Sequence, residues 1–311
     1  EINKFHSTFI DSIQRYVHKG RIHSEINQLR SDQGGTVSGR LSYSNPNLQQ
    51  IPARNKEYGD KIRSLFLPEE GRQWGSFDYS QQEPRLVAHY AAAVDNNFTG
   101  ADEFIEAYKN EAADFHQIVA DMAGISRTNA KTINLGLFYG MGKAKLAKEL
   151  GISKDAADNL LNKYHSRVPF VKKLAEAVTG SASKYGFIRT IKGRKCRFDM
   201  WEPATFGMNK AMQYEEAKAI YGNNIRRAFT YKALNRLIQG SAADQTKQAM
   251  INCYKAGFMP LLQIHDELCF SINEENDIKG VKEVMENAIE NLKVPFKVDV
   301  AIGKSWGEAK E

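Results

Sequence analysis

Strand-like runs near both ends of this chain enclose a long helical middle, and this order limits the fold more than any other feature. One apolar run, 73–80, precedes the middle, and two others, 261–272 and 295–303, follow it. The spacing of apolar residues predicts helices from about 101 to 185, over 206–255 and over 276–292. Residues 5–31 are expected to be broken and partly helical. Strands so far apart can share a sheet only if the helices form an insertion, so we expect an α+β fold.

Composition is that of an ordinary globular chain of 311 residues, with 42% hydrophobic and 26% charged residues. No apolar run approaches the roughly 18 residues of a membrane span, and no targeting signal is visible, so we expect a cytoplasmic protein without a membrane partner. Cys196, Cys253 and Cys269 are far apart and odd in number, which favours a reducing compartment over a disulfide framework or zinc site. Lysine and arginine exceed aspartate and glutamate by 6, which permits a polyanionic partner without requiring one.

The run LLQIHDELCFSI (261–272) alternates like a strand, yet His265, Asp266 and Glu267 occupy its middle. A buried carboxylate is costly unless it is paired, protonated or bound to a metal. One interpretation is a hairpin turn with the acids in water. The other is a metal site, because Asp78 ends the run at 73–80 and could converge with Asp266 on Mg²⁺ if the two strands are neighbours. For Asp78 alone, the simpler interpretation is an N-cap of the helix expected over 83–94.

The segment SRTNAKTINLGLFYG (126–140) carries a helical stripe. Four residues spaced four apart fall on one face over about 18 Å: Arg127, Lys131, Leu135 and Tyr139. Ser126 is a candidate N-cap, which would place both cations in the first turns, where free backbone N–H groups already favour an anion. His116 could add a donor from upstream. The stripe therefore predicts a phosphate chain as ligand, or else a solvated basic face with Tyr139 in the core.

Basic and polar residues recur in two further segments. The first, 34–58, is rich in Gly, Ser, Asn and Pro and includes Arg40, Asn47 and Gln50. The second has five cations within nine residues: Arg189, Lys192, Arg194, Lys195 and Arg197. Either segment could contact a nucleic-acid backbone without sequence preference, and either could equally be a solvated face.

Taken together, these segments resemble the family A, or DNA polymerase I type, polymerases. Five blocks occur in the order of that family: SGRLSYSNPNLQQIP (38–52), DYSQQEPR (78–85), RTNAKTINLGLFYG (127–140), NRLIQGSAAD (235–244) and IHDE (264–267). The similarity runs from about residue 7 to the C-terminus. The short interval between His116 and Arg127, and the single Arg before Lys131, are more similar to the bacteriophage branch than to the bacterial repair enzymes.

The resemblance implies a right-hand polymerase fold, with an antiparallel palm sheet and a large helical fingers insertion. Residues 36–98 and 229–311 would form the palm, and 99–228 the fingers. Residues 1–35 would be a remnant of the thumb base, since the thumb is largely missing and no exonuclease domain is present. We expect a monomeric polymerase core, and the sequence leaves open whether a processivity partner exists.

The implied activity is template-directed DNA synthesis, in which dNMP passes from a dNTP to a primer 3′-OH with release of pyrophosphate. Asp78 and Asp266, with the Tyr79 carbonyl, would bind two Mg²⁺ ions, for which Mn²⁺ could substitute. Lys131 would also protonate the leaving pyrophosphate. Glu267 would be a secondary acid beside the metals.

The resemblance also assigns the substrate contacts. The nucleotide would be held by Gln82, Glu83, His116, Arg127, Lys131, Leu135 and Tyr139. Glu83 would exclude a 2′-hydroxyl, whereas Leu135 stands where the family usually has Phe or Tyr, which leaves dideoxynucleotide discrimination open. The primer–template DNA would contact Arg40, Asn47, Gln50, Asn235, Gln239 and His265.

Three other functions are compatible with parts of this sequence. A single-subunit RNA polymerase has a related palm, but Glu83 and the block at 38–52 argue against it. A DNA-binding core without catalysis gains support from the missing thumb and loses it from the retained Asp78 and Asp266. A Mg²⁺-dependent nuclease would have no use for the stripe from Arg127 to Tyr139.

Overall fold

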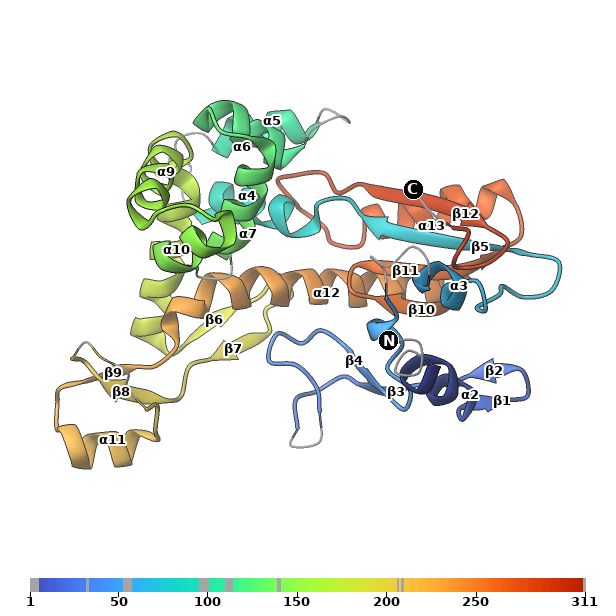
Figure 1. Cartoon of the computed structure of the whole chain (residues 1–311), viewed down its shortest axis with the longest axis horizontal. Helices are drawn as coiled ribbons and strands as arrows, with labels where there is room; N and C mark the ends of the chain where they lie inside the picture. The colour runs from blue at the N-terminus through green and yellow to red at the C-terminus, as the bar shows by residue number, and fades with distance from the viewer. Residues whose placement is uncertain are drawn as a thin grey trace. The chain divides into compact units, whose positions relative to one another are not determined.

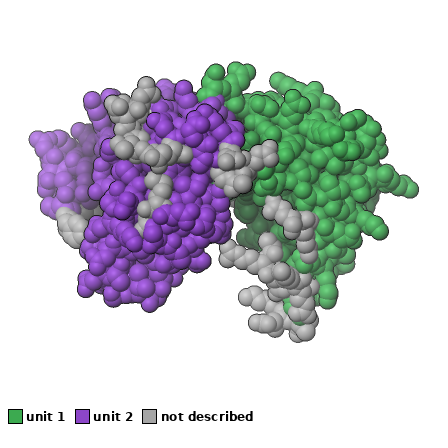
Figure 2. All heavy atoms as spheres, turned by 90° about the horizontal axis from the view of Figure 1, so that it is seen from above, with its two compact units in different colours: residues 1–82, 242–291, 296–311 green, residues 83–241, 292–295 purple. Residues whose placement is uncertain are grey.

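The structure is a computed structural model that describes residues 6–31, 34–52, 58–94, 101–109, 114–138, 141–205, 207 and 210–309. The chain is a mixture of helices and sheet, and it divides into two compact units (Figure 2). Unit 1 comprises residues 1–82, 242–291 and 296–311, and unit 2 comprises residues 83–241 and 292–295. In the described part of the chain, no helix combines the length and the apolar character that a bilayer crossing requires.

Unit 1 is built on a four-stranded antiparallel sheet with the order β10-β11-β5-β12 (Figure 1). β5 (Gln73–Tyr79) lies between β11 (Glu267–Ile272) and β12 (Val298–Gly303), and β10 (Pro260–Ile264) pairs with the outer side of β11. A strand from the first third of the chain is therefore flanked by strands from its end. The expectation of one sheet made from distant segments is confirmed.

β10 and β11 form a hairpin, so the run at 261–272 is not one strand. His265 and Asp266 make the turn, His265 with a φ of 56°, and Ile264 pairs with Glu267 across it. The hairpin interpretation was right about the turn. It was wrong to leave the acids in water, because Asp266 and Glu267 are both partly buried.

Both faces of the central strand are covered, and five of the seven residues of β5 are buried. On one face, the rings of Phe77 and Phe270 lie 5.4 Å apart, edge to face, and the Tyr79 hydroxyl donates to the carbonyl of Met285 in α13 (Glu275–Glu286). The other face belongs to a core cluster that includes Trp74, Cys269, Ala301, Leu41, Tyr43, Leu48, Ile51, Ile62, Leu262, Ile264, Trp306 and Ala309. Asp78 is half-buried and is the charged residue of this strand.

The N-terminal part of unit 1 is made of short elements, as expected for residues 5–31. In chain order they are a π-helical turn η1 (His6–Asp11), α2 (Ser12–Gln14), β1 (Val17–His18), β2 (Arg21–Ile22), β3 (Glu25–Asn27), β4 (Ser42–Ser44), the 3₁₀ turn η2 (Leu48–Gln50) and α3 (Gly59–Arg63). β1 pairs with β2 and β3 with β4. Leu41, Tyr43 and Leu48 bring the turn-rich segment into the core.

Unit 2 is mainly helical, as the spacing of apolar residues predicts. As far as residue 185 its helices are, in chain order, α4 (Gln82–Val94), α5 (Ala101–Lys109), α6 (Phe115–Ala123), α7 (Arg127–Phe138), α8 (Lys143–Leu150), α9 (Lys154–Arg167) and α10 (Pro169–Tyr185). Rings of Phe104, Phe115 and Phe170 pack at 4.9–5.1 Å in the core. Side-chain caps begin several helices; Ser126, for example, accepts from the backbone N–H of Asn129, which confirms it as the cap of α7.

The expectation of helix over 206–255 is wrong for its first part. After β6 (Phe187–Arg189) and β7 (Lys195–Arg197), the chain forms β8 (Trp201–Pro203), α11 (Tyr214–Tyr221), β9 (Ile225–Arg227) and the 3₁₀ turn η3 (Thr230–Lys232) before α12 (Ala233–Lys255) begins. β8 pairs with β9, and the Arg227 guanidinium lies 4.6 Å from the centre of the Trp201 ring. Strands of three residues are too short to give a periodic signal. Near the C-terminus, α13 also ends earlier than expected, at Glu286.

Candidate active site

Three carboxylates lie at one end of the central sheet of unit 1. Asp78 on β5 is directly opposite Glu267 on β11 and Asp299 on β12. Directly opposed residues of an antiparallel pair project to the same face. Asp266 precedes Glu267 in the hairpin turn. The strand of Asp78 and the hairpin of Asp266 are therefore neighbours, which the metal-site interpretation requires.

The electrostatics of Asp266 favour a bound cation. Burial raises its pKa, and the neighbouring Glu267 adds to the rise, whereas a backbone hydrogen bond and the positive groups of Arg40 and His265 oppose it. Burial and like charge both destabilise the carboxylate, and a divalent ion would remove that cost. The position is thus suited to a metal ligand.

The donor set fits an ion that is shared with a substrate. Within the described ranges, no group of three or more His, Cys, Asp and Glu side chains is close enough to hold a metal by itself. Mg²⁺ typically takes one or two carboxylates and completes its shell with water and substrate phosphates. The Tyr79 ring is committed to the core by its hydrogen bond to Met285 (2.6 Å), so only the Tyr79 backbone carbonyl is left for a metal.

Glu267 is tied to its own strand. Its carboxylate accepts a hydrogen bond from the thiol of Cys269, two residues along on the same face, at 3.3 Å. Burial raises the pKa of Cys269, so the thiol keeps its proton and remains a donor. Trp74 donates to Ser76 at 3.2 Å beside this pair.

Asp299 was missed from the sequence. Its run, PFKVDVAIG, is a strand-like alternation with one acid in it, which is the same signal that drew attention to Asp266. A single acid on the polar side of an alternating strand is ordinary, however. Only the register, which places Asp299 opposite Asp78, makes it a candidate.

Arg40 and His265, both predicted to bind DNA, come together in unit 1. They line a cavity of about 10 Å³, roughly the space of one water, with Leu41, Ala243, Thr246, Lys247, Met250 and Gln263. Asn47 caps η2, where its side-chain oxygen accepts from the Gln49 backbone at 3.1 Å. Gln50, the last residue of η2, is exposed.

Gln82 is buried, with 3% of its surface exposed. Its amide nitrogen donates to three acceptors on α12: Ala242 O, Gln245 Oε1 and Thr246 Oγ1. These bonds fix the first residue of α4 in unit 1. Glu83, the next residue, is half-buried and belongs to unit 2.

The stripe of unit 2 lies on the accessible side of α7. Arg127 and Lys131 are exposed and Leu135 is half-buried, while Ala130 and Ile133 are buried on the other side. Tyr139, the fourth member, lies outside the described residues. Exposure of two cations within two turns is compatible with either an anionic ligand or a solvated face.

Arg127 already has a partner. Its Nε and Nη2 atoms lie 2.7 and 2.6 Å from Oδ2 of Asp114, the N-cap of α6. Burial alone would raise the pKa of Asp114, but the hydrogen bond from Arg127 and those from the Gln117 and His116 backbones bring the pKa below its ordinary value. Asp114 therefore stays ionised and holds the guanidinium beside α6. Sequence reasoning did not find this pair.

His116 is held by a buried chain of hydrogen bonds that the sequence did not reveal. The Tyr164 hydroxyl on α9 donates to Oδ1 of Asn134 on α7 at 2.6 Å, and the Asn134 amide nitrogen lies 3.0 Å from Nδ1 of His116. Because the amide nitrogen can only donate, neutral His116 must carry its proton on Nε2. Burial and the charges of Lys131 and Arg127 lower the pKa of His116, against the effect of Asp114, so the ring is neutral at pH 7.

Asn235 and Gln239 lie one turn apart on the part of α12 that belongs to unit 2. Both are half-buried, and Leu234, Leu237 and Ile238 around them are buried. The spacing places the two amides on one side of the helix.

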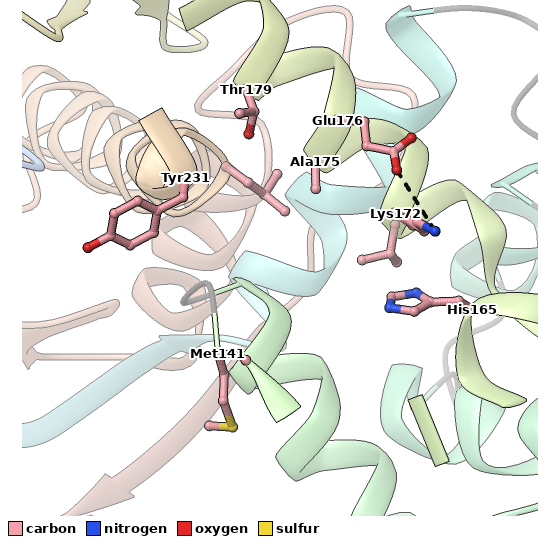
Figure 3. Close-up of a pocket in the computed structure, with 10 residues that line it drawn as sticks. Met141, His165, Lys172, Ala175, Glu176, Thr179 and Tyr231 are labelled. Atoms are coloured by element: carbon pink, nitrogen blue, oxygen red, sulfur yellow. Dashed lines mark ion pairs between the residues drawn. The ribbon is translucent and has the colours of Figure 1, made fainter. Parts of the chain in front are cut away.

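Unit 2 also contains a cavity of about 500 Å³ (Figure 3). α10 contributes Val171, Lys172, Ala175, Glu176 and Thr179, and other segments contribute Met141, Gly142, His165, Tyr231 and Leu234. Lys172 and Glu176 form an ion pair at 4.0 Å. No residue of the predicted site lines this cavity, although Met141 follows the stripe closely along the chain.

Comparison with known proteins matches the chain to one family. The family model for DNA polymerase family A covers residues 1–308. The DNA-directed DNA polymerase of Pseudomonas phage M6 is 37% identical over 99% of this chain and 50% of that protein. The thermostable DNA polymerase I of Thermus filiformis is 34% identical over 100% of this chain and 36% of that protein.

A solved structure gives the same result. The POL domain of Pol1 from M. smegmatis, in a complex with DNA primer-template and dNTP, is 34% identical, with a TM-score of 0.77 over 99% of this chain and 52% of that chain. The chain thus spans about half or less of the proteins that it matches. Because the family model covers nearly all of its residues, the chain belongs to DNA polymerase family A.

Proposed function

We propose that the chain is the polymerase core of a DNA-directed DNA polymerase, which adds dNMP from a dNTP to a primer 3′-OH and releases pyrophosphate. One observation carries this proposal: β5 with Asp78 lies directly beside the hairpin of Asp266 and Glu267, in a chain of family A. The partners would be primer–template DNA and dNTPs, with the chain acting as a monomer.

The two compact units support a division of labour. In this proposal the antiparallel sheet of unit 1 is the palm, formed by residues 36–98 and 229–311, and residues 99–228 of unit 2 are the fingers. Residues 1–35 would belong to the thumb base. The main segment of compact unit 2, residues 83–241, is longer at both ends than the proposed fingers, residues 99–228.

Family A DNA polymerases generally use divalent metal ions. Asp78, Asp266 and the Tyr79 carbonyl would hold two Mg²⁺, or Mn²⁺, with Glu267 close by. When bound, such ions offset the charge at the α-phosphate and acidify the primer hydroxyl. The raised pKa of Asp266 supports this assignment, because a carboxylate in that position gains from a cation.

Unit 2 would bind the nucleotide. Arg127, Lys131 and neutral His116, through its Nε2 proton, would bind the triphosphate, and Lys131 would give a proton to the departing pyrophosphate. Before the nucleotide binds, Asp114 would hold the Arg127 guanidinium in position. On binding, the guanidinium would leave Asp114 and contact the phosphate oxygens instead. Leu135 would lie at the sugar and Tyr139 at the templating position.

Glu83 would exclude the 2′-hydroxyl. The burial of Gln82 supports a positioning role for that residue: it would fix the start of α4, and so Glu83, without touching the nucleotide. Arg40, Asn47, Gln50, Asn235, Gln239 and His265 would contact the primer–template. The shared cavity of Arg40 and His265 supports a joint role for these two.

Primer extension on a defined template tests the proposal and separates it from an RNA polymerase. With Mg²⁺ and a DNA primer, the chain should use dNTPs in strong preference to NTPs. Glu290→Gln, an exposed acid of unit 1, is the matched control for loss of one negative charge and should leave extension unchanged. Preferential use of NTPs, or no extension at all, would reject the proposed activity.

A further inference from the structure

The positive charge of the chain is concentrated in one segment to which the proposed function gives no role. Residues 184–232 contain eleven Lys and Arg and four Asp and Glu, a net charge of +7 in a chain whose total is +6. The rest of the chain therefore has no net positive charge. A solvated basic face would need no such concentration, so this segment calls for an anionic partner.

Much of this charge lies on the β6–β7 hairpin of unit 2 (Figure 1). The register gives three pairs: Phe187–Arg197, Ile188–Cys196 and Arg189–Lys195. Ile188 and Cys196 are each only 5% exposed, so their pair faces the interior. The other two pairs project to the outer face, which carries three cations and one aromatic ring.

Aromatic rings lie among these cations. The Arg189 guanidinium is 5.5 Å from the centre of the Phe187 ring, and Lys195 Nζ is 4.8 Å from it. Just before the hairpin, Lys184 Nζ lies 5.1 Å from the ring of Tyr185, which is 57% exposed. We call these six residues the basic–aromatic surface: Lys184, Tyr185, Phe187, Arg189, Lys195 and Arg197.

The charge of these cations is not neutralised by the residues that the structure describes. Across the described parts of the chain, no ion pair joins any of the four to a carboxylate. The ion pair of this segment, Arg226 with Glu202 at 2.9 Å, lies instead on β9 and β8. Arg189 does donate to the carbonyl of Gly193 at 3.0 Å, which orients its guanidinium without cancelling its charge.

The cations of this surface are suited to phosphates, and its aromatic rings are suited to the flat faces of unpaired bases. Single-stranded nucleic acid offers both, and proteins bind it with cations for the backbone and aromatic rings for the bases. Duplex DNA offers phosphates but keeps its base faces stacked, and an acidic protein surface has no bases to stack on Tyr185 or Phe187. Among these partners, a single strand uses both features.

We propose that the basic–aromatic surface binds single-stranded DNA, with bases against Tyr185 and Phe187 and phosphates on Lys184, Arg189, Lys195 and Arg197. This inference rests on the proposed function for the source of the strand. The strand would be either the unpaired template ahead of the primer end or a strand displaced during synthesis.

Fluorescence anisotropy with a labelled oligothymidylate of about 16 nucleotides tests the proposal on the whole chain. In R189Q/K195Q/R197Q, the slope of log affinity against log salt should fall by about 2, at about 0.7 for each phosphate lost. If the affinities converge near 1 M salt, binding at about 0.1 M salt weakens by roughly 100-fold. Tyr185→Ala should weaken binding by about tenfold through lost stacking, with little change in the salt slope.

The matched control is K148Q/K154Q/K173Q, which removes the same charge from three exposed lysines of α8, α9 and α10 in the same unit. It should change the affinity by less than about twofold. Thermal unfolding of both triple variants checks that the fold survives. An equal loss in the control would show that only net charge matters, and would overturn the proposal.

Primer–templates with a blunt end, a long 5′ template overhang or a displaced 5′ flap identify the strand. The overhang should increase the affinity of the wild type and not of R189Q/K195Q/R197Q if the surface holds the template. If the surface holds a displaced strand, the 5′ flap should instead increase the affinity of the wild type and not of R189Q/K195Q/R197Q. Equal weakening on the blunt duplex, or no weakening on any single strand, would overturn the proposal and leave duplex DNA or an acidic protein as partner.

The result remains separable from the proposed function. Asp78→Asn should lose primer extension and keep the gain in affinity from single strands. If the wild type failed to extend primers but its single-strand binding still depended on Arg189, Lys195 and Arg197, the proposed activity would fail while this inference stood.

Discussion

Replacing Tyr164 with Phe would remove one hydroxyl from the interior of unit 2 and break the chain of hydrogen bonds that ends at His116. Tyr164 and Asn134 have no exposed surface, so water cannot replace the lost donor at Oδ1 of Asn134. A buried polar atom left without a partner costs about 1–3 kcal/mol. Asn134→Leu would leave two groups without their hydrogen-bond partner, the Tyr164 hydroxyl and Nδ1 of His116, which destabilises the fold by about 2–4 kcal/mol.

The double variant N134L/Y164F gives the decisive number. Each single variant includes the cost of breaking the 2.6 Å bond between Tyr164 and Asn134, whereas the double variant removes both of its partners together. The double variant should therefore be less destabilised than the sum of the singles, by about 1–3 kcal/mol. Hydrogen exchange of the backbone amides of α6, α7 and α9, read by mass spectrometry, measures these local opening free energies without assuming two-state unfolding.

Tyr221→Phe, on the exposed side of α11, is the matched control and should change the same amides by less than about 0.5 kcal/mol. In the wild type, the ¹⁵N spectrum of His116 should show the proton on Nε2. Strict additivity of the two single variants, within about 0.5 kcal/mol, would refute the network.

Three further predictions concern pH and the site. Burial lowers the pKa of His89, His116 and His165 in unit 2, so on acidification these side chains take up protons more readily in the unfolded chain than in the folded one. Their contribution to stability is therefore complete above about pH 6.5 and is lost as the pH falls through the lower pKa values of the folded protein. A thermal-unfolding midpoint that does not change between about pH 8 and pH 5 would contradict this. Asp299→Asn, which removes a charge opposite Asp78, should raise the Mg²⁺ concentration for half-maximal primer extension by about fivefold, or about 1 kcal/mol, and an unchanged midpoint would show that Asp299 acts apart from the metals. Glu83→Ala should increase the use of NTPs relative to dNTPs by about tenfold or more, and unaltered selectivity in competitive extension would remove its role at the sugar.

The sequence was sufficient where one short pattern has one physical cause. The cost of an isolated buried carboxylate indicated that Asp78 and Asp266 could converge if their strands were neighbours. β5 does pair with β11, which begins directly after Asp266 in the hairpin turn. The spacing of Arg127, Lys131 and Leu135 predicted a helix with one accessible stripe, and α7 carries it with Ser126 as its cap.

The sequence was insufficient where the cause lies between segments. Asp299 matters only through its register with Asp78, and the partner of Arg127 is an N-cap 13 residues upstream. The bonds of Asn134 depend on which helices pack against α7. Likewise, β8 and β9 are stabilised by each other across α11, and neither is long enough to be recognised alone.

The most direct test of the carboxylate site is the rate of single-nucleotide incorporation into a primer–template by Asp266→Asn, measured by rapid quench across a Mg²⁺ titration. Binding of the same DNA is measured in parallel by anisotropy. The proposed mechanism predicts that the rate falls by at least about 1,000-fold at saturating Mg²⁺, because the variant loses a metal ligand, while the DNA affinity stays nearly unchanged. A rate within tenfold of the wild type would contradict the assignment of Asp266, and with it the metal site on β5 and the β10–β11 hairpin.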